Sequence, residues 1–199
     1  MKTIWIITGE ASGDQYGAEL AQAIWNLQPD AVIKGMGADH MRKAGVDIMV
    51  DSTDLGIIGI VEAVKHLPFF ISLMKKLVRK AAEERPAAVV MIDYPGFNLR
   101  FAQRLKKLNI PVVYYISPQV WAWKKGRIKT LEACVERMLC IFPFEPQVYK
   151  DTKLDARFVG HPLLDALKPY AENRQPRDPN LVILLPGSRK GPGQRDPAW

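Results

Sequence analysis

The sequence predicts an α/β fold built on a doubly wound parallel sheet. Short apolar runs recur along the 199 residues, and segments with apolar side chains at helical spacing separate them. Such runs are typical of strands that are buried on both faces of a parallel sheet. Strands that alternate with helices form right-handed βαβ units, which place helices on both faces of the sheet.

The expected elements follow one another from the N-terminus. The first strand is Thr3 to Thr8, and Asp14 is placed to cap the following helix, which Pro29 ends. The glycines of Gly35-Met36-Gly37 indicate a turn after the second strand. The further strands are expected at residues 31–34, 46–50, 87–92, 111–116, 138–142 and 157–159.

The chain is expected to contain one large domain, residues 1–168, and a short remainder. Between 169 and 180 the apolar pattern disappears and polar residues and prolines crowd together, which is typical of a linker. The apolar run Leu181 to Leu185 then leads into Pro186-Gly187-Ser188-Arg189. This pattern predicts that residues 181–199 begin a second α/β domain with its first strand and loop.

The composition excludes a disordered or fibrous chain, because 48% of the residues are hydrophobic and 25% are charged. The net charge is +7, and residues 65–129 contain 14 basic and only 3 acidic side chains. This basic middle predicts an anionic partner, although solvated helix faces explain it equally well. No apolar run reaches the ~18 residues of a membrane span, so we expect a cytoplasmic protein.

The first candidate site follows the first strand, since ligands of open parallel sheets bind at the carboxyl ends of the strands. The loop Gly9-Glu10-Ala11-Ser12-Gly13-Asp14 offers free backbone amides at a helix start, which suit an anion or a sugar hydroxyl. The alternative is a tight turn that Asp14 caps. The candidate substrate-binding residues are Gly9, Glu10, Ser12 and Gly13.

The strongest single candidate is Asp93, which follows six apolar residues and therefore reaches the carboxyl edge of the sheet. Pro95 and Gly96 indicate a turn that starts the next helix. An ionised carboxylate at this edge can accept a proton from a hydroxyl nucleophile. The alternative is that Asp93 braces the turn. Asn98 either binds a polar ligand or bonds to the loop backbone.

A third loop, Ser117 to Arg127, combines two tryptophans with three cations after another buried strand. This combination suits a sugar phosphate or a hinge between domains. We take Gln119, Trp121 and Trp123 as candidate substrate-binding residues. His161, in the fourth loop, has either a structural or a catalytic role.

The segment Leu67 to Lys80 predicts an amphipathic helix, with Leu67 and Ile71 on its apolar arc and a basic face on which Phe69 falls among the cations. A helix that packs its apolar face on the core and solvates its charges is one explanation. The other is contact with an anionic bilayer without crossing it. The candidate membrane-contact residues are Phe69, Phe70, Lys75 and Lys76.

Seven sequence motifs follow one another along residues 3–189, and in this order they closely resemble the motifs of bacterial lipid-A-disaccharide synthases. A chance match of seven ordered motifs is not expected. The motifs are Gly9-Glu10-Ala11-Ser12-Gly13-Asp14, Gly59-Ile60-Val61-Glu62, Asp93-Tyr94-Pro95-Gly96-Phe97-Asn98, Tyr115-Ile116-Ser117-Pro118-Gln119-Val120-Trp121-Ala122-Trp123, Phe142-Pro143-Phe144-Glu145, Phe158-Val159-Gly160-His161-Pro162 and Leu185-Pro186-Gly187-Ser188-Arg189.

The resemblance implies an inverting glycosyltransferase of the two-domain GT-B type with a Rossmann-like N-terminal domain, peripherally associated with the inner membrane. Such enzymes join UDP-2,3-diacylglucosamine to 2,3-diacylglucosamine 1-phosphate and release UDP and the lipid A disaccharide 1-phosphate. Residues 1–168 are then the acceptor-side domain, 169–180 the linker, and 181–199 the start of the UDP-sugar-binding domain.

The resemblance also implies roles for single residues. Asp93 matches the candidate general base, which deprotonates the 6-hydroxyl of the acceptor, and Arg189 would stabilise the diphosphate leaving group. The sequence has no DxD motif, and we expect neither a cofactor nor a metal. The expected partners are the donor, the acceptor and an anionic inner-membrane surface, with no nucleic acid; a homo-oligomer stays open.

After Arg189 the sequence departs from the family, whose members continue into an acidic helical segment and a whole nucleotide-binding domain. Residues 190–199 are instead rich in proline and glycine. We therefore expect a truncated or frame-shifted product or a fragment, without useful transferase activity on its own.

Two other function classes compete with this interpretation. A Rossmann-type oxidoreductase needs GxGxxG after the first strand and an acidic residue after the second, and the sequence has neither. A non-catalytic basic module that binds a membrane or a nucleic acid would explain the basic middle. Against nucleic acid, the charges are dispersed over several elements and no recognised binding motif accompanies them.

Overall fold

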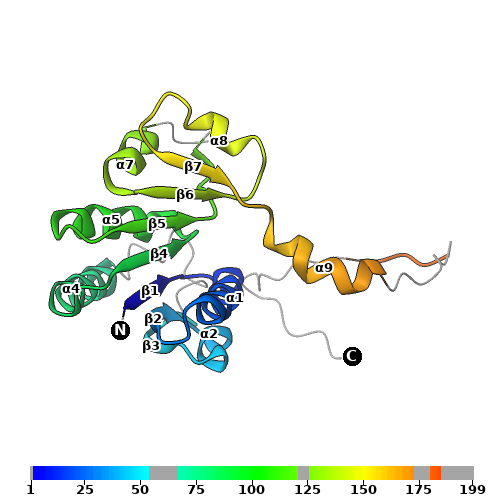
Figure 1. Ribbon diagram of the computed structural model, residues 1–199, viewed down its shortest axis with the longest axis horizontal. Helices are drawn as coiled ribbons and strands as arrows, with labels where there is room; N and C mark the ends of the chain where they lie inside the picture. Colours follow the sequence, from blue (N-terminus) through cyan, green and yellow to red (C-terminus); the bar gives the residue numbers. More distant parts are fainter. Residues whose placement is uncertain (1, 54–66, 121–125, 173–179, 185–199) are drawn as a thin grey trace.

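The computed structural model describes residues 2–53, 67–120, 126–172 and 180–184 and contains a seven-stranded parallel sheet (Figure 1). All six strand pairs are parallel, in the order β3-β2-β1-β4-β5-β6-β7. This confirms the expected α/β fold. The strands are β1 (Thr3–Ile7), β2 (Val32–Gly37), β3 (Asp47–Asp51), β4 (Ala88–Ile92), β5 (Val112–Tyr115), β6 (Arg137–Cys140) and β7 (Asp155–Phe158).

Helices cover both faces of the sheet (Figure 1). Helices α4, α5 and α7 pack in one hydrophobic cluster, and α1 and α2 contribute to a second cluster on the opposite face. The helices are α1 (Ala11–Leu27), α2 (Asp39–Ala44), α4 (Leu67–Glu84), α5 (Pro95–Lys107), α7 (Arg127–Cys134), α8 (Glu145–Val148) and α9 (Pro162–Glu172).

The first strand illustrates why the apolar runs become central strands. Trp5, Ile6 and Ile7 are all completely buried. Because successive side chains of a strand point to opposite faces, Trp5 and Ile7 join the α4–α5–α7 cluster, whereas Ile6 joins the α1–α2 cluster. A strand in this position therefore needs apolar residues at every position, as the sequence indicated.

The expected turn at Gly35-Met36-Gly37 is wrong, because β2 continues to Gly37. These glycines lie where Met41 of α2 packs closely on the strand. A Cβ atom added at Gly35 would clash with the backbone carbonyl oxygen of Ile6 on β1 and lie 2.7 Å from the Met41 methyl carbon, and one added at Gly37 would also meet the Met41 side chain. The glycines therefore admit a neighbouring strand and helix instead of turning the chain.

The end of the described chain also differs from the sequence-based expectation. Helix α9 continues through Pro169 to Glu172, so the first part of the expected linker is helical. All residues of α9 from Leu163 onward are exposed, and water can satisfy the carbonyl group that the proline leaves without an amide partner. Residues 181–184, expected as a strand, are exposed and adopt neither helix nor strand.

The sheet changes direction between β1 and β4. From β1 the chain builds outward through β2 and β3, and it then returns to add β4 on the other side of β1. In the parallel pairing of these strands, Ile7 lies beside Met91, so their carboxyl ends are neighbours. This is the topological switch point, where open α/β sheets form a crevice for ligands.

Candidate functional site

Two loops meet at the switch point, one after β1 and one after β4. Gly9 follows β1 and is buried against the ring of Tyr94, which follows β4. A Cβ atom at position 9 would lie 2.5 Å from a ring carbon of Tyr94, so only glycine allows this approach. The structure thus brings together the Gly9 and Asp93 motifs, which the sequence separates by more than eighty residues.

Asp93 lies at this junction in an uncommon backbone conformation. Its φ is 46° and that of Tyr94 is 47°, so two consecutive residues other than glycine occupy the left-handed region. Each such conformation costs about 1–3 kcal/mol and persists only where the surrounding structure enforces it, and such strain is concentrated at functional sites. Tyr94 is also the N-cap of α5, which begins at Pro95. The turn therefore aims Asp93 at the edge of the sheet and starts the next helix.

The surroundings of Asp93 raise the pKa of its carboxyl above the ordinary value. Burial, which disfavours the charged form, is the largest cause, and the nearby Glu10 carboxylate adds to it. A hydrogen bond from the Tyr94 backbone opposes the rise. The pKa of the Tyr94 hydroxyl is raised as well, first by burial of the Tyr94 side chain and then by the Glu10 carboxylate. A carboxylate with a raised pKa is a stronger base than a free one, which suits proton abstraction.

Two buried side chains hold the Asp93 backbone. The Asn98 amide donates to the carbonyl oxygens of Asp93 at 2.7 Å and Ile92 at 3.3 Å, and the Tyr114 hydroxyl donates to the Asp93 carbonyl at 2.6 Å. Asn98 is fully buried and bonds to the loop backbone, which is the second of the two alternatives that the sequence left open. Sequence reasoning missed Tyr114, although a hydroxyl at the carboxyl end of a buried strand is a usable signal.

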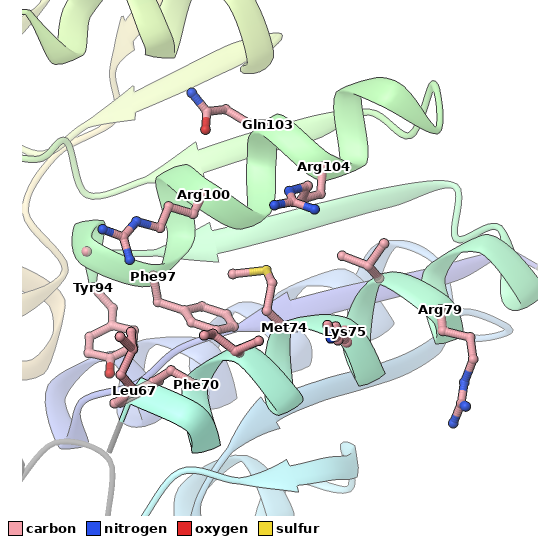
Figure 2. A pocket seen from close by; sticks show the side chains of 13 residues that line it. Leu67, Phe70, Met74, Lys75, Arg79, Tyr94, Phe97, Arg100, Gln103 and Arg104 are labelled. Carbon is pink, nitrogen blue, oxygen red and sulfur yellow. The ribbon is translucent and has the colours of Figure 1, made fainter. Parts of the chain in front are cut away.

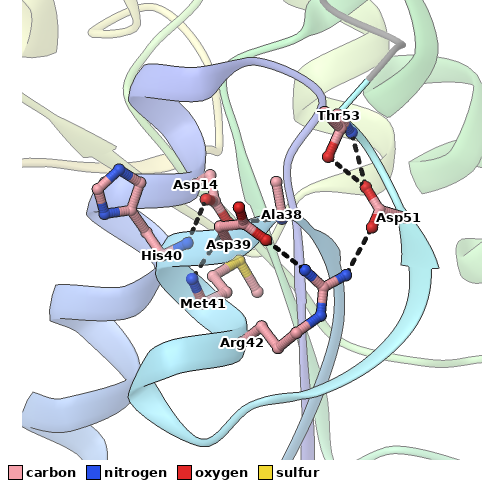
Figure 3. A network of polar contacts seen from close by, with 8 residues as sticks. All are labelled: Asp14, Ala38, Asp39, His40, Met41, Arg42, Asp51 and Thr53. Atoms are coloured by element: carbon pink, nitrogen blue, oxygen red, sulfur yellow. Dashed lines mark hydrogen bonds and ion pairs between the residues drawn. The ribbon is translucent and has the colours of Figure 1, made fainter.

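Asp14 does not cap its own helix, which corrects the sequence-based expectation. Helix α1 begins earlier, at Ala11, and Asp14 lies inside it. Its buried carboxylate accepts hydrogen bonds from the backbone amides of Ala38 at 2.6 Å, His40 at 2.8 Å and Met41 at 3.2 Å (Figure 3). These amides are at the start of α2, so Asp14 caps a helix that follows 24 residues later in the chain.

The remaining residues of the first loop differ in exposure. Glu10 is the N-cap of α1 and is half-buried, Ser12 is exposed in the first turn, and Gly13 is buried beside Thr8. The amides of the first turn of α1 face no earlier carbonyl of the helix, as at any helix start. Ser12 and Glu10 can therefore reach a ligand at the switch point, whereas Gly13 lets the helix approach the strand.

A groove lies between α4 and α5, immediately after the Asp93 turn (Figure 2). Its volume is about 910 Å³, and apolar side chains of α4 form much of its wall together with Phe97. Leu67 and Ile71, expected on the core-facing side of the helix, remain 47% and 49% exposed here. The lining residues are Leu67, Phe70, Ile71, Met74, Lys75, Val78, Arg79, Tyr94, Gly96, Phe97, Arg100, Gln103 and Arg104.

The candidate membrane residues are all on α4, and two of them, Phe70 and Lys75, line the groove. Phe69 is 48% exposed, and its ring contacts that of the half-buried Phe70 edge to face at 5.6 Å. Lys75 and Lys76 are exposed on the same helix. In the part of the chain that the structure describes, none of the helices is long and apolar enough to cross a membrane.

Other sequence-based candidates lie elsewhere. Gln119 is exposed just after Ser117 and Pro118, which are buried. His161 makes a ring contact with Phe142 and accepts a hydrogen bond from the Leu163 amide, which indicates a structural role at the start of α9. The described ranges contain no cluster of three potential metal ligands. Trp121, Trp123, Arg189 and the motifs at residues 59–62 and 185–189 lie outside the described residues.

Comparison with known proteins decides the family. The profile of the lipid-A-disaccharide synthetase family matches residues 4–195. The chain belongs to this family. Lipid-A-disaccharide synthases from Koribacter versatilis and Syntrophus aciditrophicus are 46% and 42% identical to it over 96% of its length. The chain spans about half the length of these relatives, 52% and 51% respectively.

Solved structures confirm the fold expected of a lipid-A-disaccharide synthetase. MurG of Acinetobacter baumannii is similar with a TM-score of 0.53, 12% identity, and coverage of 81% of this chain and 46% of that one. A UDP-GlcNAc 2-epimerase of Neisseria meningitidis gives a TM-score of 0.57, also at 12% identity, over 87% and 49% of the two chains. These likenesses show the fold alone: the chain has the parallel α/β architecture of about half of each of these proteins.

Proposed function

We propose that this chain forms the acceptor-side half of an inverting glycosyltransferase of lipid A biosynthesis. The donor is UDP-2,3-diacylglucosamine and the acceptor is 2,3-diacylglucosamine 1-phosphate. Family membership supports the lipid A glycosyltransferase class, and it does not favour the non-catalytic binding module. The observation that carries the specific mechanism is the half-buried Asp93 at the switch point, with its raised pKa.

In this mechanism Asp93 is the general base. Its carboxylate accepts the proton of the acceptor 6-hydroxyl while that oxygen forms a bond to the anomeric carbon of the donor. The bond from this carbon to the UDP phosphate oxygen breaks at the same time, and UDP leaves on the opposite face, so the configuration inverts. Glu10 and the buried surroundings keep the Asp93 carboxylate basic. Fixed positive charge, including Arg189, stabilises the leaving diphosphate.

The supporting contacts give Asn98 and Tyr114 a positioning role. Both donate to the Asp93 carbonyl, and Asn98 also donates to Ile92. They enforce the left-handed turn and fix the direction of the carboxylate. Glu10 and Ser12 in the first loop, with Gln119, Trp121 and Trp123 in the third, remain our candidates for contacts to the sugars.

The test uses a chimera in which residues 1–184 of this chain precede the second half of the Koribacter versatilis relative. Disaccharide 1-phosphate formation is measured by mass spectrometry. We expect Asp93→Asn to lower kcat by ~10²–10⁴-fold, because the amide cannot accept the proton. The matched control is Asp47→Asn, an exposed aspartate at the amino end of β3. An Asp93→Asn chimera that keeps more than a tenth of the activity would refute the role.

We also propose that the α4 face contacts an anionic membrane surface peripherally. Phe69 supplies exposed apolar area, and Lys75 and Lys76 supply positive charge on the same helix. Replacing Phe69 and Phe70 by Ser should reduce co-sedimentation with vesicles that contain anionic lipid. The control variant is Lys129→Gln, an exposed residue on α7. Equal sedimentation of the Phe69→Ser/Phe70→Ser variant and the unchanged chain would contradict this proposal.

A further inference from the structure

The α4–α5 groove is built to take an apolar chain. Its volume of about 910 Å³ is in the upper part of the ~300–1,000 Å³ range of small-molecule sites. Leu67 and Ile71 stay about half exposed although they border a cavity rather than a convex surface. Grouped apolar side chains that remain exposed in a concavity indicate a binding site, unlike single apolar residues scattered over a surface.

The groove also carries positive charge that the described residues leave largely uncompensated. Four of its lining residues are cations, and none of its lining residues is acidic. Arg79 pairs with Glu83 at 3.8 Å, whereas Lys75, Arg100 and Arg104 form no ion pair in the described part of the chain. Apolar walls with a cationic rim match a ligand that has an apolar chain and an anionic group.

The position of the groove identifies which amphiphile this is. Tyr94 lies at one end of the groove (Figure 2), and the lining residues Tyr94, Gly96 and Phe97 are within four residues of Asp93 in the chain. A chain lying in the groove therefore has its head group close to the Asp93 turn. Contact with a bilayer surface does not require a cavity between two helices. It also does not explain why this cavity lies beside the proposed catalytic carboxylate of Asp93.

We propose that the α4–α5 groove binds one acyl chain of the acceptor glycolipid, and that Arg100 and Arg104 bind its phosphate. This proposal rests on the proposed function, since it names where the acylated sugar phosphate lies. Arg100 and Arg104 are four residues apart on α5 and therefore lie on the same helix face. Their planar guanidinium groups suit phosphate oxygens better than ammonium groups do.

The first experiment measures binding of soluble n-alkyl phosphates to the 199-residue chain by isothermal titration calorimetry, below their micelle concentrations. We expect saturable binding of one molecule per chain. Affinity should rise about fourfold for each added methylene group, which corresponds to ~0.8 kcal/mol. Alkyl maltosides of equal chain length should bind at least tenfold more weakly, because they lack the phosphate. Equal affinity for the two head groups would overturn the role of the arginines.

Two variants locate the site. Gly96→Leu adds a side chain at a lining position where a Cβ atom meets nothing within 4 Å, so the fold tolerates it while the groove fills. Gly126→Leu, equally open and at the start of α7, is the matched control. We expect decyl phosphate to bind at least tenfold more weakly to Gly96→Leu and unchanged to Gly126→Leu. Thermal unfolding checks that both variants fold.

The charge is tested separately. Arg100→Gln/Arg104→Gln should lose the preference for the phosphate over the maltoside, whereas Lys107→Gln, exposed on the same helix but outside the groove, should keep it. Unchanged decyl phosphate binding to Gly96→Leu would overturn the proposal. So would binding that occurs only to anionic vesicles, which would assign the face to the bilayer.

Alkyl phosphate binding and turnover test the groove and the catalytic role of Asp93 independently. Asp93→Asn should bind decyl phosphate as well as the unchanged chain does, because Asp93 is not among the residues that line the groove. Loss of turnover in Asp93→Asn together with full binding to Gly96→Leu would refute the groove alone. Groove binding together with turnover that is independent of Asp93 would refute the catalytic mechanism alone.

Discussion

Asp14 and Asp93 are two carboxylates near the same edge of the sheet, and their surroundings differ in kind. Asp14 is completely buried and accepts hydrogen bonds from three backbone amides. Asp93 is half-buried, lies in a left-handed turn, and has the Glu10 carboxylate nearby. The Asp14 carboxylate therefore joins two helices, whereas the Asp93 carboxylate accepts a hydrogen bond from the Tyr94 backbone and is positioned through its own backbone, which Asn98 and Tyr114 hold.

The hydrogen-bond partners of the two carboxylates show which aspartate is structural. A buried charge must be paired or hydrogen-bonded, and Asp14 meets this requirement by joining α1 to the start of α2. The Asp93 carboxylate has fewer hydrogen-bond donors than the Asp14 carboxylate. Hydrogen bonds from Asn98 and Tyr114 hold its backbone in the left-handed turn. Such a local cost, enforced by neighbouring residues, is characteristic of functional positions.

The largest expected effect on stability comes from removing the Asp14 carboxylate. Asp14→Ala leaves three amides at the start of α2 without their acceptor and should lower the free energy of unfolding by about 3 kcal/mol. Asp39→Ala is the control, because Asp39 is at the same helix start with its side chain 72% exposed. That variant should lose less than about 1 kcal/mol. Urea unfolding measures the free energy of unfolding of both variants. Equal losses in Asp14→Ala and Asp39→Ala would contradict the structural role of the Asp14 carboxylate.

A smaller effect of opposite sign is expected at Asp93. Its pKa is raised in the folded state, so the folded chain binds the proton more tightly than the unfolded chain does. The stability from this group is therefore present below the unfolded pKa of ~3.9 and is lost as pH rises through the folded pKa. Asp93→Asn, which cannot ionise, should therefore stabilise the chain at pH 7, because it no longer places a charge in a buried site beside the Glu10 carboxylate.

This gain should disappear in thermal unfolding at pH 3, where the aspartate of the unchanged chain is protonated as well. Asp47→Asn, exposed at the start of β3, controls for general effects of removing a negative charge. A stability of Asp93→Asn that falls below that of the unchanged chain at pH 7 would mean that the Asp93 carboxylate braces the turn instead.

The sequence predicted much of this arrangement because the strands depend on local composition. Runs such as Trp5-Ile6-Ile7 must be apolar at every position, and the polar residue after such a run reaches the carboxyl edge, which located Asp93. The role of Asp14 could not be predicted, since its hydrogen-bond donors lie 24 to 27 residues away in the chain. Local capping rules describe only the nearest helix.

The same limit explains the other differences. The local sequence at Gly35 and Gly37 is typical of a turn, and only the close approach of Ile6 on β1 and of Met41 on α2 shows why glycine is needed there. The α4–α5 groove was not predicted either, because helical periodicity assigned Leu67 and Ile71 to the core-facing side. Which apolar residues of a helix face a neighbour and which border a cavity depends on the second helix, which periodicity does not describe.

We propose that Asp93 performs chemistry while Asp14 maintains the fold. Disaccharide formation per folded molecule, measured for Asp93→Asn and Asp14→Asn in the same chimera, distinguishes these roles. We expect a fully folded Asp93→Asn protein whose turnover falls at least a hundredfold, and an Asp14→Asn protein whose turnover follows its folded fraction. Normal turnover per folded Asp93→Asn molecule would show that Asp93 is not the general base.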